Sequence, residues 1–389
     1  MSARRLQVVH VVPSISPTRG GPARCVPGLA GALCLQDVDC TLVTGHDAEQ
    51  VAPEVAALPV LSAARLPLPF EIPGPGLVAT LNRAIRRADI VHLHSVWNGV
   101  TTVAAWLARA HRKVIVLSPH GMLSEQNVRL HGPFKRVYRA LIEEANLEAV
   151  AGFHFLDDTE RESCLWLASA RERPCIVEPN GLGMAAVDQL LRLGPSGIVA
   201  AAGQESNARH LVFLGRLAAV KGLELQLEVL ADLRAQGRPV HLHLIGPDHG
   251  EAAPLRALAA SLHLADHVHV HGPVYDDRRF LWLHEADAVL LTSYTECNPM
   301  TAIETMTVGG VLVATDTCHL DLAAAAGAVR VVPRSRARLC EAITQLLDDG
   351  RSAEAQRAAA RRYAGEHLEW KALAVAMRGF YQSLLESRA

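Results

Sequence analysis

No stretch of this sequence approaches the roughly 18 consecutive uncharged apolar residues that a membrane-spanning helix requires. The formal net charge is only −2, so the chain lacks the overall positive field that attracts nucleic acid. Its eight cysteines are scattered, and no two have the Cys-x-x-Cys spacing of zinc and redox sites. These absences argue against a membrane-spanning protein, a nucleic-acid-binding protein and a zinc or disulfide scaffold. They predict reduced thiols and a cytoplasmic location.

The first residues also lack the pattern of a signal peptide. Their apolar stretch is short, contains Gln7 and His10, and runs into Pro13 without a small-residue cleavage site. We therefore predict a buried strand over residues 6–12. The Gly-x-Gly-x-x-Gly fingerprint of a dinucleotide site does not follow this strand, which counts against a simple NAD site.

A length of 389 residues, half of them apolar, favours two α/β domains of similar size. Short apolar runs alternate with helical patterns in two series, and they predict strands at 90–94 in the first series and at 240–245 in the second. Residues 58–75 are expected to be a proline-rich connection. Between the two series, residues 183–209 are rich in small side chains and include Gly194 and Gly197. We predict a first domain over residues 1–182, a linker over 183–209, a second domain over 210–367 and a last helix within 368–389.

The most informative stretch covers residues 292–310. An apolar run ahead of it predicts a buried strand, and apolar residues then recur at helical spacing until Gly309 and Gly310. Asn298 is the expected N-cap residue, with Pro299 at the first helical position. Such a helix start holds an anion, usually a phosphate. Glu296 and Glu304 would flank the anion and accept hydrogen bonds from sugar hydroxyls, although an ordinary βαβ unit explains this stretch equally well.

A second cluster of charge lies between Gly215 and Gly222. Arg216 and Lys221 stand between a predicted strand end and a helix start, where they could bind the oxygens of a diphosphate. His120 lies at the carboxyl end of another predicted strand, the edge at which open α/β sheets bind ligands. Each of these residues alone is more simply explained as a surface or loop residue. Together with the two glutamates, they indicate a phosphate site.

These motifs carry a resemblance to a known family. They are Gly20-Gly21, the segment from Ser118 to Met122, Pro179-Asn180-Gly181, the Arg216 and Lys221 motif, and Glu296 with Glu304. With them the chain resembles the retaining GT-B glycosyltransferases of family 4, which use nucleotide-diphosphate sugars, along nearly all of its length. The resemblance implies two Rossmann-like α/β/α domains that face each other across a cleft. The first would bind the acceptor, the second would bind the donor, and the last helix would pack back on the first.

The resemblance also implies residue roles. Glu296 and His120 would lie by the transferred sugar, Glu304 would hold the ribose, and Arg216 with Lys221 would hold the diphosphate. Further donor contacts would come from Gly21, Val274, Asn298, Met300 and Thr301. One departure from the family is Asn298-Pro299, where members often have Phe-Gly, so the phosphate amides would begin at Met300.

The implied reaction moves a hexose from a UDP-, GDP-, ADP- or dTDP-linked donor to an acceptor hydroxyl and keeps the anomeric configuration. No metal or other cofactor is expected. An arginine-rich, lysine-poor chain suggests a high-GC bacterium, in which surface polysaccharides or glycosylated natural products are plausible products. Two alternatives stay open: a sugar-nucleotide epimerase of the same fold, and a non-catalytic relative that binds a nucleotide sugar.

Two further patterns have simpler explanations. Asp37 and Asp39 match the Asp-x-Asp string of metal-dependent glycosyltransferases, but they lie at the opposite edge of the predicted sheet and indicate a surface turn. Alternating histidines at 92 and 94 and at 267, 269 and 271 could bind metal, although strands in a histidine-rich chain explain them better. A basic helix over 133–150, with Lys135, Arg136 and Arg139, raises peripheral contact with the inner membrane face as a second hypothesis, although a helix packed on its own domain with a basic rim explains it better.

Overall fold

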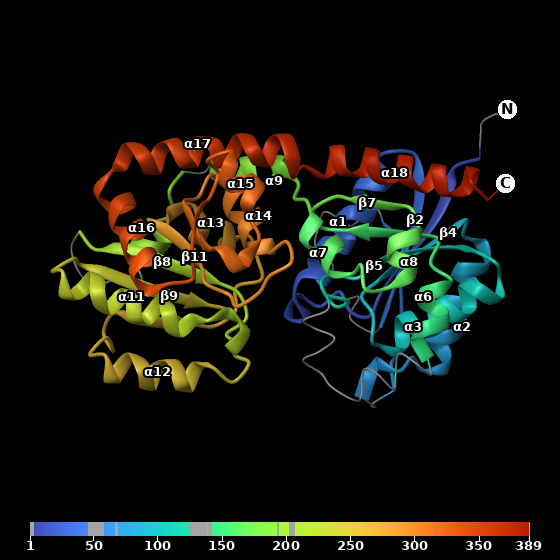
Figure 1. The fold of residues 1–389 in the computed structure, drawn as a ribbon, viewed down its shortest axis with the longest axis horizontal. Coiled ribbons are helices and arrows are strands. Elements are labelled where there is room, and N and C mark those ends of the chain that lie inside the picture. The colour runs from blue at the N-terminus through green and yellow to red at the C-terminus, as the bar shows by residue number, and fades with distance from the viewer. Residues whose placement is uncertain are drawn as a thin grey trace. The chain divides into compact units, whose positions relative to one another are not determined.

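The computed structural model describes residues 4–45, 58–66, 69–124, 138, 142–192, 194–201 and 207–388. The chain forms two compact units. In Figure 1 the colour follows the residue number from blue at the N-terminus to red at the C-terminus. The first unit contains Met1–Gly181 and Trp370–Ala389, and the second contains Leu182–Glu369. Each is an α/β unit built on a parallel sheet, so the expected fold class is confirmed.

The sheet of the first unit has the strand order β3-β2-β1-β4-β5-β6-β7. The strands are β1 (Leu6–Val12), β2 (Val38–Gly45), β3 (Val60–Ala63), β4 (Ile90–His94), β5 (Val114–Ser118), β6 (Gly152–Phe155) and β7 (Cys175–Val177). The helices are α1 (Gly21–Cys34), α2 (Pro75–Arg87), α3 (Gly99–Ala110), α6 (Glu144–Glu148), α7 (Asp158–Ser163), α8 (Ala168–Glu172) and α18 (Trp370–Glu386). Because β2 and β4 lie on opposite sides of β1, the strand order reverses between β1 and β4, as in doubly wound sheets.

The last helix, α18, packs closely on the first unit. A Cβ atom on Gly28 of α1 would lie 2.5 Å from Nε1 of Trp370, and one on Gly152 of β6 would lie 2.8 Å from Leu384. Both glycines therefore leave the space that α18 occupies. Tyr381 of this helix is completely buried. The C-terminal helix thus belongs to the core of a unit whose other residues all come from the first half of the chain.

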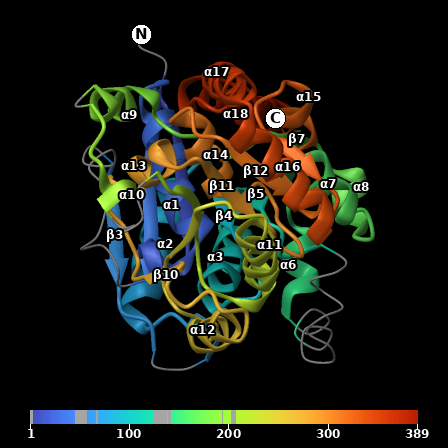
Figure 2. The same cartoon turned by 90° about the vertical axis from the view of Figure 1, so that its left-hand side faces the viewer.

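The sheet of the second unit has the order β10-β9-β8-β11-β12-β13. Strands β10, β11 and β12 of this sheet are labelled in Figure 2. The strands are β8 (Arg209–Leu214), β9 (Val240–Ile245), β10 (Val268–His271), β11 (Ala288–Leu291), β12 (Leu312–Thr315) and β13 (Arg330–Val332). The helices are α9 (Met184–Leu191), α10 (Ile198–Ala201), α11 (Leu223–Ala235), α12 (Ala252–Ser261), α13 (Arg278–Glu285), α14 (Met300–Thr307), α15 (Asp321–Ala325), α16 (Arg336–Asp348) and α17 (Gly350–His367).

Both faces of this second sheet are buried. Val212 and Leu214 of β8 pack with residues of α13 and α14, whereas Leu211 and Phe213 of the same strand pack with α11 and α16. This alternation explains why residues 211–214 read as a continuous apolar run, since each of these four side chains meets a helix layer.

Three expectations differ from the structure. The segment expected to be a linker contains α9 and α10, whose Val187 and Val199 are each 2% exposed in the core of the second unit. The segment reads as a linker because small residues outnumber its large apolar ones, but Val187 and Val199 are buried, and Leu190, Leu191 and Ile198 pack partly buried against the same core. The proline-rich connection before α2 contains β3, an edge strand that pairs with β2. Pro299, not Asn298, is the N-cap of α14.

Within the described residues, no helix is long and apolar enough to cross a membrane. The basic residues Lys135, Arg136 and Arg139, on which the membrane-contact hypothesis rests, lie outside the described residues.

Candidate active site

The candidate site of the second unit lies where the strand order of its sheet reverses. From β8 the chain moves outward to β9 and β10, and from β11 it moves the other way to β12 and β13. At such a switch point, the loops after the two central strands turn apart and leave a crevice at their carboxyl ends. The two motifs singled out in the sequence follow β8 and β11, the two strands on either side of this point.

The loop after β8 is shaped by close backbone contacts. A Cβ atom on Gly246, after β9, would lie only 1.8 Å from the carbonyl oxygen of Gly215. The loop continues into a short 3₁₀ turn, Ala219–Lys221, and Gly222 in the left-handed region (φ 57°) starts α11. The amide of Tyr294 donates to the carbonyl of Val220 at 2.9 Å, so the loops after β8 and β11 are joined. This contact brings Lys221 next to the residues after β11.

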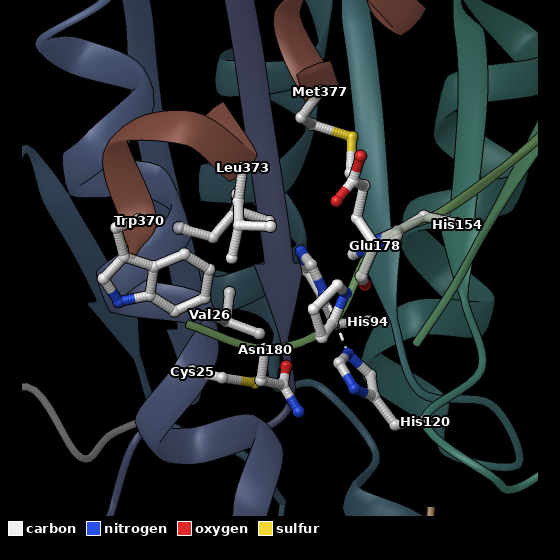
Figure 3. A pocket seen from close by; sticks show the side chains of 12 residues that line it. Cys25, Val26, His94, His120, His154, Glu178, Asn180, Trp370, Leu373 and Met377 are labelled. Atoms are coloured by element: carbon white, nitrogen blue, oxygen red, sulfur yellow. Dashed lines mark hydrogen bonds between the residues drawn. The ribbon is translucent and has the colours of Figure 1, made fainter. Parts of the chain in front are cut away.

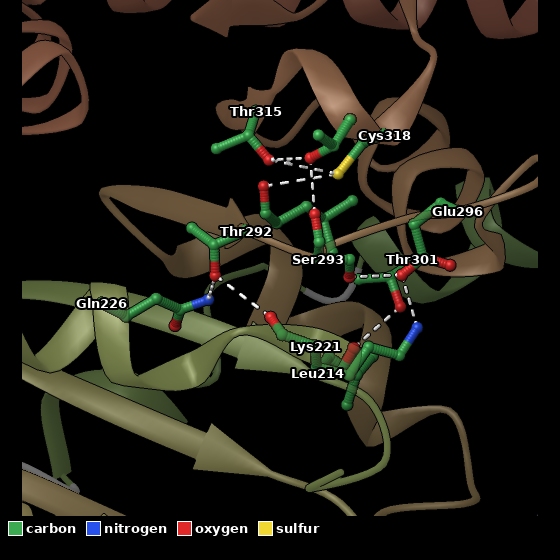
Figure 4. A network of polar contacts seen from close by, with 11 residues as sticks. Leu214, Lys221, Gln226, Thr292, Ser293, Glu296, Thr301, Thr315 and Cys318 are labelled. Atoms are coloured by element: carbon green, nitrogen blue, oxygen red, sulfur yellow. Dashed lines mark hydrogen bonds and ion pairs between the residues drawn. The ribbon is translucent and has the colours of Figure 1, made fainter. Parts of the chain in front are cut away.

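Lys221 and Glu296 form an ion pair, with Nζ of Lys221 2.5 Å from Oε1 of Glu296 (Figure 4). The side chains are 16% and 11% exposed, so water screens the pair little. The hydroxyl of Ser293 also donates to this carboxylate. Residues from two separate motifs thus form one ion pair. The lysine could exchange Glu296 for the oxygens of an anionic ligand.

The start of α14 lies beside this pair. Pro299 is its N-cap and supplies no side-chain acceptor, so the amides of Met300 and Thr301 have no acceptor within the helix. The hydroxyl of Thr301 donates to the carbonyl of Leu214, the last residue of β8, at 2.8 Å. This bond fixes the helix start against the β8 end of the switch point. Asn298, with a φ of 50°, makes the turn that leads into it.

Glu304, on the second turn of α14, is almost completely buried. It is 1% exposed and accepts a hydrogen bond from Nε of Arg279 at 3.1 Å. Arg279 lies on α13 and also donates to the carbonyl of Tyr275, next to the half-buried Val274. The loop after β10 is thereby connected to Glu304 through Arg279. Arg216, by contrast, is exposed, one residue beyond Gly215.

The sequence analysis did not identify Arg279, Ser293, Thr292 or Gln226. The buried Gln226 of α11 donates to Oγ1 of Thr292, which in turn donates to the carbonyl of Gly222, both at 2.9 Å. A glutamine among the apolar residues of a buried helix face was the available signal, because a buried amide requires partners.

Gly21 and His120 lie in the first unit, at the carboxyl ends of its strands. Gly21 is the first residue of α1 and follows Gly20, whose φ is 97°. His120 follows β5 and has a φ of 52°, which is uncommon for a residue other than glycine. Burial, and to a lesser degree the neighbouring His154, lowers the pKa of His120 to about 3, so its ring is neutral near pH 7.

Comparison with known proteins agrees with this architecture. Residues 20–181 match the family described as glycosyl transferase 4-like domain, and residues 199–363 match glycosyl transferases group 1. A D-inositol 3-phosphate glycosyltransferase of Jonesia denitrificans is 30% identical over 76% of this chain and 71% of its own length. This chain belongs to the GT-B glycosyltransferases.

Other relatives of this glycosyltransferase agree with the assignment. The Thermobispora bispora enzyme of the same name is 28% identical over 77% of the chain and 72% of its own length. Among solved structures, Anabaena HepE in complex with UDP-glucose has a TM-score of 0.74 at 17% identity, covering 98% of this chain and all of that one. Sucrose-phosphate synthase from Thermosynechococcus elongatus has a TM-score of 0.72 at 17% identity over similar shares. At such low identity the structural matches show the fold alone.

The Asp-x-Asp string of this glycosyltransferase forms a surface turn. Asp37 and Asp39 lie 3.3 and 3.6 Å from the guanidinium of Arg5, and Asp39 also accepts a hydrogen bond from Gln7. Asp37 directly precedes β2 and Asp39 is its second residue, so both lie at the amino edge of the sheet, opposite the strand ends that carry Gly21 and His120. Their carboxylates therefore pair with arginine and glutamine side chains at the edge away from the ligand-binding loops.

The alternating histidines are joined by hydrogen bonds across strands. On the edge strand β10, Nε2 of His269 lies 2.9 Å from Nδ1 of His241, and Nε2 of His271 lies 3.1 Å from Nδ1 of His243. In the first unit, His10, His92 and His94 each place one nitrogen within 4.8 Å of the others. Both nitrogens of His92 already have hydrogen-bond partners, Tyr381 and Ser118. A metal ion there would have to displace those contacts.

Proposed function

We propose that this glycosyltransferase is a retaining, metal-independent hexosyltransferase of family 4 that moves a sugar from a nucleotide-diphosphate donor to an acceptor hydroxyl. The observation that carries the proposal is the Lys221–Glu296 ion pair at the switch point of the second sheet, beside the start of α14. A lysine, an exposed arginine (Arg216) and a helix start at one sheet edge suit a diphosphate.

For the donor, we propose that Lys221 and Arg216 hold the diphosphate together with the amides of Met300 and Thr301. Glu304 would accept hydrogen bonds from the ribose hydroxyls, and its ion pair with Arg279 orients it for this role. Val274 would lie against the base. Glu296 and Asn298 would contact the sugar.

For the two residues of the first unit, we propose the roles that the family resemblance implies. Gly21 would offer its amide to a phosphate, and His120 would contact the transferred sugar. In the reaction, the acceptor hydroxyl attacks the anomeric carbon of the sugar from the same face from which the leaving group departs. The departing phosphate takes the proton of the acceptor hydroxyl. Negative charge grows on that phosphate, so Lys221 and Arg216 stabilise the transition state more than the ground state.

The donor base and acceptor are proposed from relatives. Anabaena HepE was crystallised with UDP and with UDP-glucose, so UDP-sugars are the first donors to test. The curated relatives are named for D-inositol 3-phosphate, which makes a phosphorylated cyclitol the first acceptor, followed by growing surface polysaccharides. We propose a cytoplasmic enzyme, with peripheral contact with the inner membrane face as the second hypothesis, for a lipid-linked acceptor.

The deciding experiment measures binding of UDP, GDP, ADP and dTDP by calorimetry to the wild type and to Lys221→Ala and Glu304→Ala. One nucleotide should bind tightly, and both substitutions should weaken its binding by at least tenfold, because each removes a charge-assisted contact. Lys371→Ala, which removes an exposed lysine of α18, is the matched control. If no nucleotide binds, or if all variants bind alike, the assigned site is wrong.

Product analysis separates the proposal from its alternatives. The proposed enzyme releases nucleoside diphosphate and glycosylated acceptor only when an acceptor is present. An epimerase would convert the sugar nucleotide without an acceptor, and a non-catalytic relative would bind the nucleotide without turnover. An anomeric configuration in the product opposite to that in the donor would overturn the retaining mechanism.

A further inference from the structure

Two chains of hydrogen-bonded side chains run beneath the strand ends of the first unit. One joins Tyr381 of α18 to His92, Ser118, His154 and the carbonyl of Glu178, through distances of 2.7, 2.7, 2.8 and 2.9 Å. The other joins three rings. Nε2 of His120 lies 3.1 Å from Nδ1 of His94, and Nε2 of His94 lies 3.0 Å from Nδ1 of His10 (Figure 3 shows the first of these bonds).

The direction of the first chain follows from chemistry alone. A carbonyl only accepts, so Nε2 of His154 carries the proton and donates to Glu178. Since the neutral ring has one N–H, its Nδ1 accepts from the hydroxyl of Ser118. Ser118 must then accept from Nε2–H of His92, whose Nδ1 accepts from the hydroxyl of Tyr381. Every group in this chain has its partner.

The chain of three rings has two allowed proton orders. Burial lowers the pKa of His10 to about 3 and that of His94 well below its usual value, so all three rings are neutral and each has one N–H. Because each ring-to-ring bond takes one proton, either all three protons lie on Nδ1 or all three lie on Nε2.

The buried end of the chain distinguishes these orders. Nε2 of His10 is fully buried and has no hydrogen-bond partner. With all protons on Nε2, that nitrogen would be an orphaned buried donor. With all protons on Nδ1, it is only an unused acceptor. Among buried backbone groups, N–H donors without a partner are rarer than acceptors without a partner. If the same holds for ring nitrogens, the order with all three protons on Nδ1 is favoured.

We infer that His10 and His94 are positioning residues that hold His120 in its Nδ1–H form, so that His120 donates a hydrogen bond to the bound substrate and does not act as a base. His94 donates Nδ1–H to Nε2 of His120, which leaves Nδ1–H as the available group of that ring. His120 and His94 both line the pocket in Figure 3. The inference rests on the proposed function for the identity of the acceptor, an oxygen of the donor sugar.

The direct test is ¹⁵N NMR of the histidine ring nitrogens in the full-length protein, labelled with ¹⁵N-histidine. Single substitutions assign the signals to individual histidines. We expect His10, His94 and His120 to carry the proton on Nδ1, whereas His92 and His154, in the first chain, carry it on Nε2. This contrast within one protein is an internal control. Protons on Nε2 in His10, His94 and His120 would overturn the inference, whatever the protein's substrate.

The functional test replaces His120 with two amide side chains, each of which places its amide group near one of the two ring nitrogens. His120→Asn places its amide near the position of Nδ1 and tolerates the left-handed backbone, whereas His120→Gln places it near Nε2. We expect His120→Gln to lose about tenfold in affinity for the sugar nucleotide, the size of one hydrogen bond, and His120→Asn to lose less. Neither substitution should change the affinity for the nucleoside diphosphate alone.

Substitutions at His94 test its positioning role. His94→Phe removes the donor to His120, so His120 should show a mixture of both forms in the nitrogen spectrum and a similar loss of sugar-nucleotide affinity. His94→Asn keeps a donor near Nδ1 and should restore both. Unchanged spectra in His94→Phe would contradict the inference. If the wild type binds no nucleoside diphosphate, the proposed function fails, and the nitrogen spectrum still decides the proton order.

Discussion

The Lys221–Glu296 pair places two opposite charges in a site that excludes most water, and only one of them can bind a diphosphate. In the structure Glu296 neutralises Lys221. An incoming phosphate therefore competes with Glu296 for the lysine, and the carboxylate is released toward other partners. Binding and catalysis should for this reason respond differently to a change at position 296.

Glu296→Gln should separate the effect of this residue on nucleotide binding from its effect on catalysis. The amide keeps the side-chain volume but loses the charge, so nucleoside diphosphate should bind as tightly as in the wild type or up to about tenfold more tightly. Turnover should fall by about 10²–10³-fold, since the residue proposed beside the sugar loses its charge. Calorimetry and initial rates measure both effects. A parallel loss of binding and turnover would show that Glu296 does not compete for Lys221.

Gly222 is the residue at which backbone conformation and close approach coincide. It has a φ of 57°, and a Cβ atom there would lie 2.5 Å from the carbonyl oxygen of Thr292. Gly222→Ala should therefore cost about 2–4 kcal/mol of unfolding free energy, from the left-handed backbone plus the clash. Gly237→Ala, also left-handed (φ 78°) but in open space, should cost only about 1 kcal/mol. Urea denaturation measures both, and equal costs would contradict the close approach.

At the scale of elements, α18 is held to the sheet by both packing and a polar bond. Tyr381 is completely buried and donates to Nδ1 of His92, 289 residues earlier in the chain. The bond is the first in a chain that reaches β6 through Ser118 and His154. A change at one end leaves a buried ring nitrogen of β4 unsatisfied.

Tyr381→Phe should accordingly lower the free energy of unfolding by about 1–3 kcal/mol, although only one oxygen atom is removed. Tyr363→Phe on α17 is the matched control, because that ring is only partly buried, and it should be close to neutral. Thermal melts of the two variants give the comparison. If Tyr381→Phe has the same melting temperature as the wild type, the hydrogen bond to His92 does not contribute to the stability of the fold.

At the scale of the whole molecule, buried neutral histidines make folding sensitive to acid. Burial lowers the pKa of all five histidines in the network of the first unit: His10, His92, His94, His120 and His154. In the second unit, burial lowers the pKa of His210, His243, His269 and His271. Their unfolded values stay near 6.5, so below this pH the unfolded chain binds more protons than the folded one.

Stability should therefore be greatest above pH 6.5 and should fall as the pH drops from 6.5 toward 4. Each such histidine contributes a slope of up to about 1.4 kcal/mol per pH unit. Glu143 and Glu178, whose pKa burial raises, act in the opposite sense but are fewer. Urea midpoints at pH 7.5, 6.5 and 5.5 measure the effect. A midpoint that does not change over this range would mean that the rings are not buried in neutral form.

Much of the fold was predictable because parallel strands buried on both faces read as short apolar runs. The strands at 6–12, 90–94 and 240–245 have the predicted bounds. The prediction failed where the signal was weak. The four residues of the edge strand β3 are partly buried or exposed, and α9 and α10 contribute only a few apolar residues to the core. The start of α14 was predicted one residue too early. Proline is common at the first helical position, so Pro299 was assigned there, whereas it is the N-cap residue.

The sequence by itself determined the alternation of strands and helices, the family and the residue types of the two charged motifs, because these depend on local patterns. Only the tertiary structure decided that Lys221 meets Glu296, that Arg279 meets Glu304, and that histidines of separate strands form continuous chains. The physical reason is strand order. Neighbours in a parallel sheet are distant in the chain, so the pairing of side chains at the strand ends follows from the crossovers and not from sequence spacing.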